Sequence, residues 1–73
     1  MSLNFTSVDV RQVLLIIADV GGFKLDMAPS VQGNVAMRYV NIPWDQALDN
    51  VLKMKNLNLV VDGNTAHITA RSK

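Results

Sequence analysis

The sequence predicts a small α+β domain in which two amphipathic helices pack against short strands in two or three layers. Three observations lead to this prediction. Two segments carry apolar residues at helical spacing, five short segments alternate apolar with polar residues, and turn-forming residues separate them. The predicted order is strand, helix, strand, strand, helix, strand, strand, and residues 1–73 form one domain.

The first two elements are a strand and a broad apolar helix. Residues 3–6 (Leu-Asn-Phe-Thr) alternate as a half-buried strand does. A helix follows to about Val20, with the Ser7 hydroxyl as a cap and the Asp9 carboxylate in the first turn. Gly21 and Gly22 end it, because glycine readily adopts the left-handed conformation. One face carries Val10, Val13, Leu14 and Ile17. Since its flanks are apolar too, we expect strands on both sides of this helix.

Two strands and a turn fill the middle of the chain. Residues 23–27 and 34–40 alternate, and residues 29–33 (Pro-Ser-Val-Gln-Gly) form the turn between them. In the later strand, one face is apolar and faces the core: Val35, Met37 and Tyr39. The opposite face points outward and carries Ala36, Arg38 and Val40.

The second helix has the clearer amphipathic pattern. Pro43 suits its first helical position. Its apolar stripe comprises Trp44, Ala47, Leu48, Val51, Leu52 and Met54. We therefore predict that Trp44 packs in the core and that Met37 and Met54 fill space there. Asp49 and Lys53 form a stabilising i, i+4 pair, and Asn56 caps the end.

A hairpin completes the fold. Leu57, Leu59 and Val61 share one face of the fourth strand, and the turn sequence Asp62-Gly63-Asn64 follows. In the fifth strand the inward-facing residues are Ala66, Ile68 and Ala70.

Composition narrows the possible functions. Seven Lys and Arg against six acidic residues give a net charge of +1, which argues against binding to nucleic acid or to an anionic membrane surface. The absence of cysteine excludes disulfides and thiol chemistry. No apolar run approaches the length of a membrane span. Because a strand begins almost at once, we expect the chain to be a piece of a longer protein with Met1 supplied as its start.

No set of residues predicts catalysis or a metal site. His67 falls on the outward face of the last strand, without a ligand-type residue at useful spacing, so a solvated histidine is expected. Asp45 and Asp49 share a helix face, but we expect both carboxylates to be solvated. A catalytic carboxylate pair needs a raised pKa, which requires burial, so these residues do not predict catalysis. A hydrolytic or ligand-binding domain would need a polar cleft, with His67 and carboxylates lining it.

A binding module is the remaining class. Several outward positions carry apolar residues where polar ones are expected, and these would mark a contact patch if they lay together. The candidate partner surface comprises Leu15, Ala36, Arg38, Val40 and Val60.

Four segments of the chain resemble a known family. They are residues 2–5 (Ser-Leu-Asn-Phe), residues 10–14 together with 17–19, residues 31–35 (Val-Gln-Gly-Asn-Val) and residues 41–49. The series resembles the secretin and TonB short N-terminal (STN, or N-zero) domain, and most closely the form found in type IV pilus secretins. Its most specific element is Pro-Trp-Asp-Gln-Ala-Leu-Asp at residues 43–49.

The resemblance implies two helices between a two-stranded and a three-stranded sheet. It also implies a periplasmic domain of an outer-membrane ring protein that serves pilus passage, with no catalytic residue and no cofactor. The implied partners are neighbouring secretin subunits and an inner-membrane lipoprotein of the PilP type. The alternative within this fold is the signalling domain of a TonB-dependent receptor, which contacts an anti-sigma regulator.

The chain departs from the usual family pattern on its outward faces. Ala36 and Val40 stand where the family strands tend to be polar, and Val60 and Val61 stand where charged residues are common. These changes leave the fold unaffected, and we expect them to mark a partner surface particular to this protein.

Overall fold

The computed structural model describes residues 2–70, and its elements follow the predicted order. In chain order they are β1 (Leu3–Asp9), α1 (Val10–Gly21), β2 (Lys24–Met27), β3 (Asn34–Tyr39), α2 (Trp44–Met54), β4 (Leu57–Asp62) and β5 (Thr65–Ala70).

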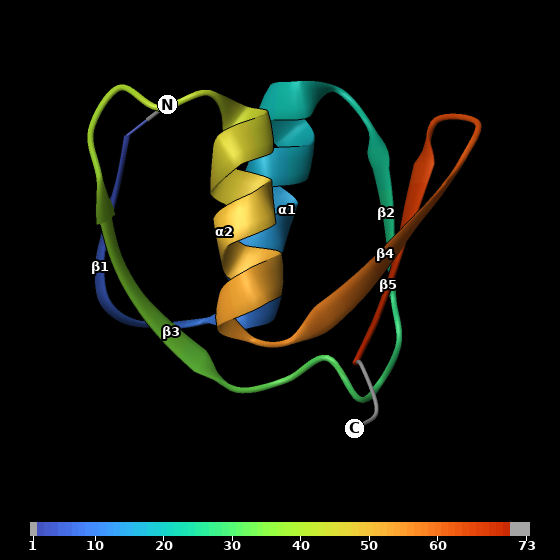
Figure 1. The fold of residues 1–73 in the computed structure, drawn as a ribbon, viewed down its shortest axis with the longest axis horizontal. Coiled ribbons are helices and arrows are strands. Elements are labelled where there is room, and N and C mark those ends of the chain that lie inside the picture. The colour runs from blue at the N-terminus through green and yellow to red at the C-terminus, as the bar shows by residue number, and fades with distance from the viewer. Residues whose placement is uncertain (1, 71–73) are drawn as a thin grey trace.

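The elements form three layers, with the helices in the middle (Figure 1). One outer layer is the antiparallel pair β1 and β3. The other is a three-stranded sheet in the order β2-β5-β4, with β5 parallel to β2 and antiparallel to β4. The two helices pack against each other, and α1 also contacts β1 and β2. The prediction of an α+β fold with helices between a two-stranded and a three-stranded sheet is confirmed.

The junction of β1 and α1 differs from the prediction. The strand continues to Asp9, which pairs with Asn34 of β3, and its register shifts between Phe5 and Val8. Asp9 is therefore the N-cap rather than a first-turn residue, and its carboxylate accepts a hydrogen bond from the backbone N–H of Arg11 at 2.9 Å. Ser7 does not cap the helix, because β1 includes it.

The core centres on α1, as its apolar breadth indicated. The side chains with no solvent exposure come from α1, the loop between β2 and β3, α2 and β5: Val10, Val13, Leu14, Ile17, Val31, Ala47, Val51 and Ile68. Gly22 ends α1 in the left-handed conformation, with φ of 72°, and its N–H donates to the carbonyl of Ala18. The predicted glycine stop is confirmed.

A loop from β2 to β3 joins the two sheets and is fastened to α1. The guanidinium of Arg11 donates from Nη1 to the carbonyl oxygens of Ala28 and Val31, at 3.2 and 3.1 Å. The N–H of Val10 donates to the carbonyl of Gly33 at 2.9 Å. These bonds satisfy loop carbonyls that no strand partner would reach.

The second helix keeps its predicted pattern with a shift of one residue at its start. Pro43 is the N-cap in an extended conformation, and Trp44 is the first helical residue. Lys53 and Asp49 form the predicted pair at 3.0 Å. Asn56 follows the helix with φ of 55°, a conformation that asparagine tolerates, so the predicted stop is confirmed.

The predicted hairpin joins β4 and β5. Gly63 has φ of 63°, while Asn64 keeps a negative φ, which is the pattern of a type II′ turn. Ala66 and Ile68 are buried as predicted, whereas Ala70 is exposed at the end of β5. Met37 is buried as predicted. Met54 is exposed instead, because it is the last residue of α2 and lies beyond the buried stripe.

Candidate partner-binding surfaces

Three of the predicted partner residues lie together on β3 and just beyond it. Ala36 and Arg38 alternate with the buried Val35 and Met37, so their side chains point away from the helices. Val40 follows the strand and is 70% exposed. We call Ala36, Arg38 and Val40 the β3 face.

The other two predicted residues lie elsewhere. Val60 is 59% exposed on the outer side of β4, where it pairs with His67 of β5. It therefore lies on the opposite layer from the β3 face, across both helices (Figure 1). Leu15 is 48% exposed and belongs to α1 in the middle layer. The structure thus divides the predicted surface into separate faces rather than one patch.

The outer side of the three-stranded sheet carries a polar pair that the sequence did not reveal. Nδ1 of His67 lies 2.9 Å from Oδ2 of Asp26, and both side chains are solvent-accessible. The parallel register of β2 and β5 places these residues side by side, although 41 positions separate them in the sequence. His67 points outward as predicted, but it has a carboxylate partner. We call Val60 of β4, His67 of β5 and the adjoining Asp26 of β2 the β4–β5 face.

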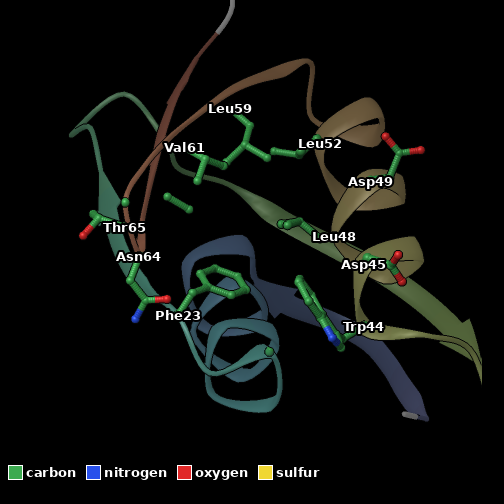
Figure 2. A pocket seen from close by; sticks show the side chains of 13 residues that line it. Phe23, Trp44, Asp45, Leu48, Asp49, Leu52, Leu59, Val61, Asn64 and Thr65 are labelled. Atoms are coloured by element: carbon green, nitrogen blue, oxygen red, sulfur yellow. The ribbon is translucent and has the colours of Figure 1, made fainter.

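A groove between α2 and the β4–β5 hairpin is the main feature that the sequence analysis missed. Its volume is about 470 Å³. Figure 2 shows Phe23 and Trp44 at one end and Leu52, Leu59 and Val61 at the other. The rings of Phe23 and Trp44 lie 5.4 Å apart between centroids, tilted by 43°.

The groove corrects the prediction that Trp44 packs in the core. Its side chain is 36% exposed and forms part of the groove wall. Val61 is 65% exposed, although it shares the inward side of β4 with the buried Leu57. The reason is visible in Figure 1, where β4 starts beside the end of α2 and diverges from it toward the hairpin. Residues near the turn therefore face open space instead of the helix.

The charged residues along the groove are acidic. Among the described residues that line it, Asp45 and Asp49 carry charge, and both lie on α2. Both carboxylates are solvent-exposed, as predicted, and Asp49 is paired with Lys53. His67 is absent from the lining, so the groove is not the polar cleft that a hydrolytic site would require.

Residues 2–70 contain no cluster of three or more His, Cys, Asp or Glu side chains that could hold a metal ion. Within the same range, neither helix has the length and apolar character needed to cross a membrane.

Comparison with known proteins finds relatives of this chain among the type IV pilus secretins. No family model matches the chain. The fimbrial assembly protein PilQ of Pseudomonas aeruginosa is 52% identical over 64 residues, covering 88% of the chain and 9% of that protein. The type IV competence pilus secretin PilQ of V. cholerae has a TM-score of 0.82 at 45% identity, covering 94% of the chain and 17% of that structure.

Type II secretins share the fold at lower identity. The N0 domain of the type II secretin of enterotoxigenic Escherichia coli superposes with a TM-score of 0.84 at 19% identity, covering 97% of the chain and 94% of that domain. A chain in the GspC–GspD complex of the type II secretion system of the same organism has a TM-score of 0.68 at 17% identity, covering 94% of the chain and 54% of its own length.

The chain belongs to the N-zero domains of secretins, the class that the three-layer fold and the sequence relatives define. Within this class its relatives include the PilQ secretins of type IV pili. The comparisons therefore favour a secretin over the TonB-dependent receptor. The chain spans only a small part of those proteins, 9% and 17% of the two PilQ chains above.

Proposed function

We propose that this domain is a non-catalytic, periplasmic docking and gating module of an outer-membrane type IV pilus secretin. In this role it holds the entrance of the secretin ring in register with the inner-membrane part of the machinery. Its membership of the N-zero class and the names of its PilQ relatives support this function.

The arrangement of the two outer faces is the observation that carries the proposal. The β3 face and the β4–β5 face lie on opposite layers, with the helices between them (Figure 1). Both expose valine, and each also carries a charged side chain, Arg38 on one and Asp26, beside His67, on the other. A surface that meets a different surface on the next copy gives a head-to-tail contact, which closes into a ring when the rotation permits.

Such a contact can be weak in the isolated domain. The parent protein holds its copies side by side, so each contact forms at a high effective concentration. We therefore expect the isolated domain to be a monomer or to associate weakly, and ring formation to depend on the full-length protein.

An inner-membrane lipoprotein of the PilP type is the second proposed partner. The GspC–GspD complex supports this by analogy, because a chain with this fold occurs in a complex with a second protein. Pull-down of the isolated domain with the periplasmic part of such a lipoprotein tests the proposal, with the periplasmic part of an anti-sigma regulator as the comparison. Capture of the regulator alone would instead support the receptor function.

Charged substitutions test the ring contact in the full-length secretin. Val40→Asp and Val60→Asp place a carboxylate on each face, and we expect both to reduce the yield of detergent-resistant rings. Gln46→Asp, on the exposed side of α2, is the matched control and should leave ring yield unchanged. Normal assembly and normal lipoprotein binding in both valine variants would contradict the proposed surfaces.

A further inference from the structure

We propose that the groove between α2 and β4 binds an extended peptide segment of a partner protein. This segment carries apolar side chains at alternate positions and at least one lysine or arginine. The site uses residues other than those of the ring contact, so each proposal can be tested independently of the other.

The free edge of β4 supplies the backbone part of the site. Among residues 2–70, β4 pairs with β5 and with no strand on its other edge. A two-residue turn makes its flanking residues, Asp62 and Thr65, a hydrogen-bonded pair. Because antiparallel pairs alternate, the backbone N–H and C=O groups of Leu59 and Val61 point to the free edge. An added strand would bond to these groups.

The side chains of the same two residues line the groove. Leu59 and Val61 face inward from β4, with Leu48 and Leu52 of α2 across from them (Figure 2). A strand that paired with β4 would direct every second side chain into this space. The volume of about 470 Å³ lies within the range of sites that enclose ligands. The edge and the groove therefore select an extended peptide with alternating apolar residues.

The negative charge of the groove favours a positively charged partner segment. The carboxylates of Asp45 and Asp49 border it, and no basic residue is among the described residues that line it. Asp49 is paired with Lys53, whereas Asp45 accepts only a backbone hydrogen bond, from the N–H of Gln46, among the bonds described, so Asp45 is the anion without a cationic partner. Trp44, which is about one-third exposed, adjoins it in the chain, and an indole face attracts a lysine or arginine side chain.

A second copy of the chain fits this site less well than a basic partner. Two copies that paired through their β4 edges would bring two acidic borders together, and like charges oppose such a contact. The observations therefore favour a segment of opposite charge from another protein.

The probe is an acetylated and amidated peptide in which valine alternates with threonine and a lysine stands at each end. A matched peptide has glutamate in place of both lysines. Titration of the ¹⁵N-labelled 73-residue chain should shift the amides of Leu59 and Val61 and the indole N–H of Trp44. We expect the glutamate peptide to bind at least about fivefold more weakly, because it loses the favourable charge pairs.

Two neighbouring valines provide a matched pair of variants. Val61→Asp places a charge inside the groove, and Val60→Asp places the same charge on the opposite side of β4. Both positions are largely exposed, so both variants should fold. Val61→Asp should weaken peptide binding by about tenfold or more, and Val60→Asp by no more than about twofold.

Three results would overturn the proposal. They are equal binding of the two peptides, equal loss in the two valine variants, and amide shifts confined to β1, β2 or β3. A fourth result, concentration-dependent shifts at Leu59 and Val61 without peptide, would also overturn it, because the groove would then belong to a second copy of the chain. Ring assembly in the full-length secretin should respond to Val60→Asp and not to Val61→Asp, which separates this site from the proposed ring contact.

Discussion

Two inward-facing residues of the three-stranded sheet should differ sharply in their effect on stability. Ile68 of β5 has no solvent exposure, and Val61 of β4 is 65% exposed on the same side of the sheet. The strand pattern alone places both in the core. The structure separates them, because β4 diverges from α2 and leaves Val61 at the groove.

The expected magnitudes follow from burial. Ile68→Ala empties a closed part of the core and should cost about 2–5 kcal/mol. Val61→Ala removes two methyl groups, each worth about 0.8 kcal/mol when fully buried. Since 65% of Val61 is already exposed, we expect a loss of about 0.5 kcal/mol.

Urea denaturation followed by far-ultraviolet circular dichroism measures both values, provided that the slope of the transition is unchanged. A domain of 73 residues has about 4–11 kcal/mol of total stability, so Ile68→Ala leaves little margin. Ile68→Val, at about 1 kcal/mol, is the milder substitute. A cost above about 2 kcal/mol for Val61→Ala would show that the groove is closed in solution and would refute this argument.

Three further substitutions test the local interactions. Arg11→Ala removes two bonds from the guanidinium to loop carbonyls and should cost about 1–3 kcal/mol, whereas the exposed neighbour Gln12→Ala should cost under about 0.5 kcal/mol in the same denaturation assay. Gly22→Ala puts a Cβ in the left-handed conformation, with φ of 72° and open space around it, so strain alone should lower stability by about 1–2 kcal/mol; an unchanged thermal midpoint would contradict this. Asp49→Asn breaks the exposed pair with Lys53 and should change stability by no more than about 0.5 kcal/mol at low salt, with a larger change indicating a role beyond that pair.

The elements themselves were largely predictable, because their signals are local. Gly22, Asn56 and Gly63 mark ends and turns through backbone conformations that few residues adopt, and each marks the expected boundary. The start of α1 was misplaced, since Ser7 and Asp9 are both good capping residues. The pairing of Asp9 with Asn34 in β3 decided between them, and that contact is not local.

The surfaces were much less predictable, because they depend on contacts between segments that are far apart in the sequence. Alternation showed which side of β3 and of β4 faces outward, but not that these two sides lie on opposite layers. The approach of His67 to Asp26 depends on the parallel register of β2 and β5, which no sequence pattern here specified. The groove depends on the angle between β4 and α2, and the exposure of Trp44 and Val61 follows from that angle.

Cysteine cross-linking tests the proposed head-to-tail contact most directly, because the chain has no cysteine of its own. Ala36→Cys and Val60→Cys together place one thiol on each face of the domain, in a full-length secretin otherwise free of cysteine. Mild oxidation should then link subunits into a ladder of dimers, trimers and larger species, while each single variant stays unlinked. Dimers from either single variant, or no ladder from the double variant in assembled rings, would contradict the account.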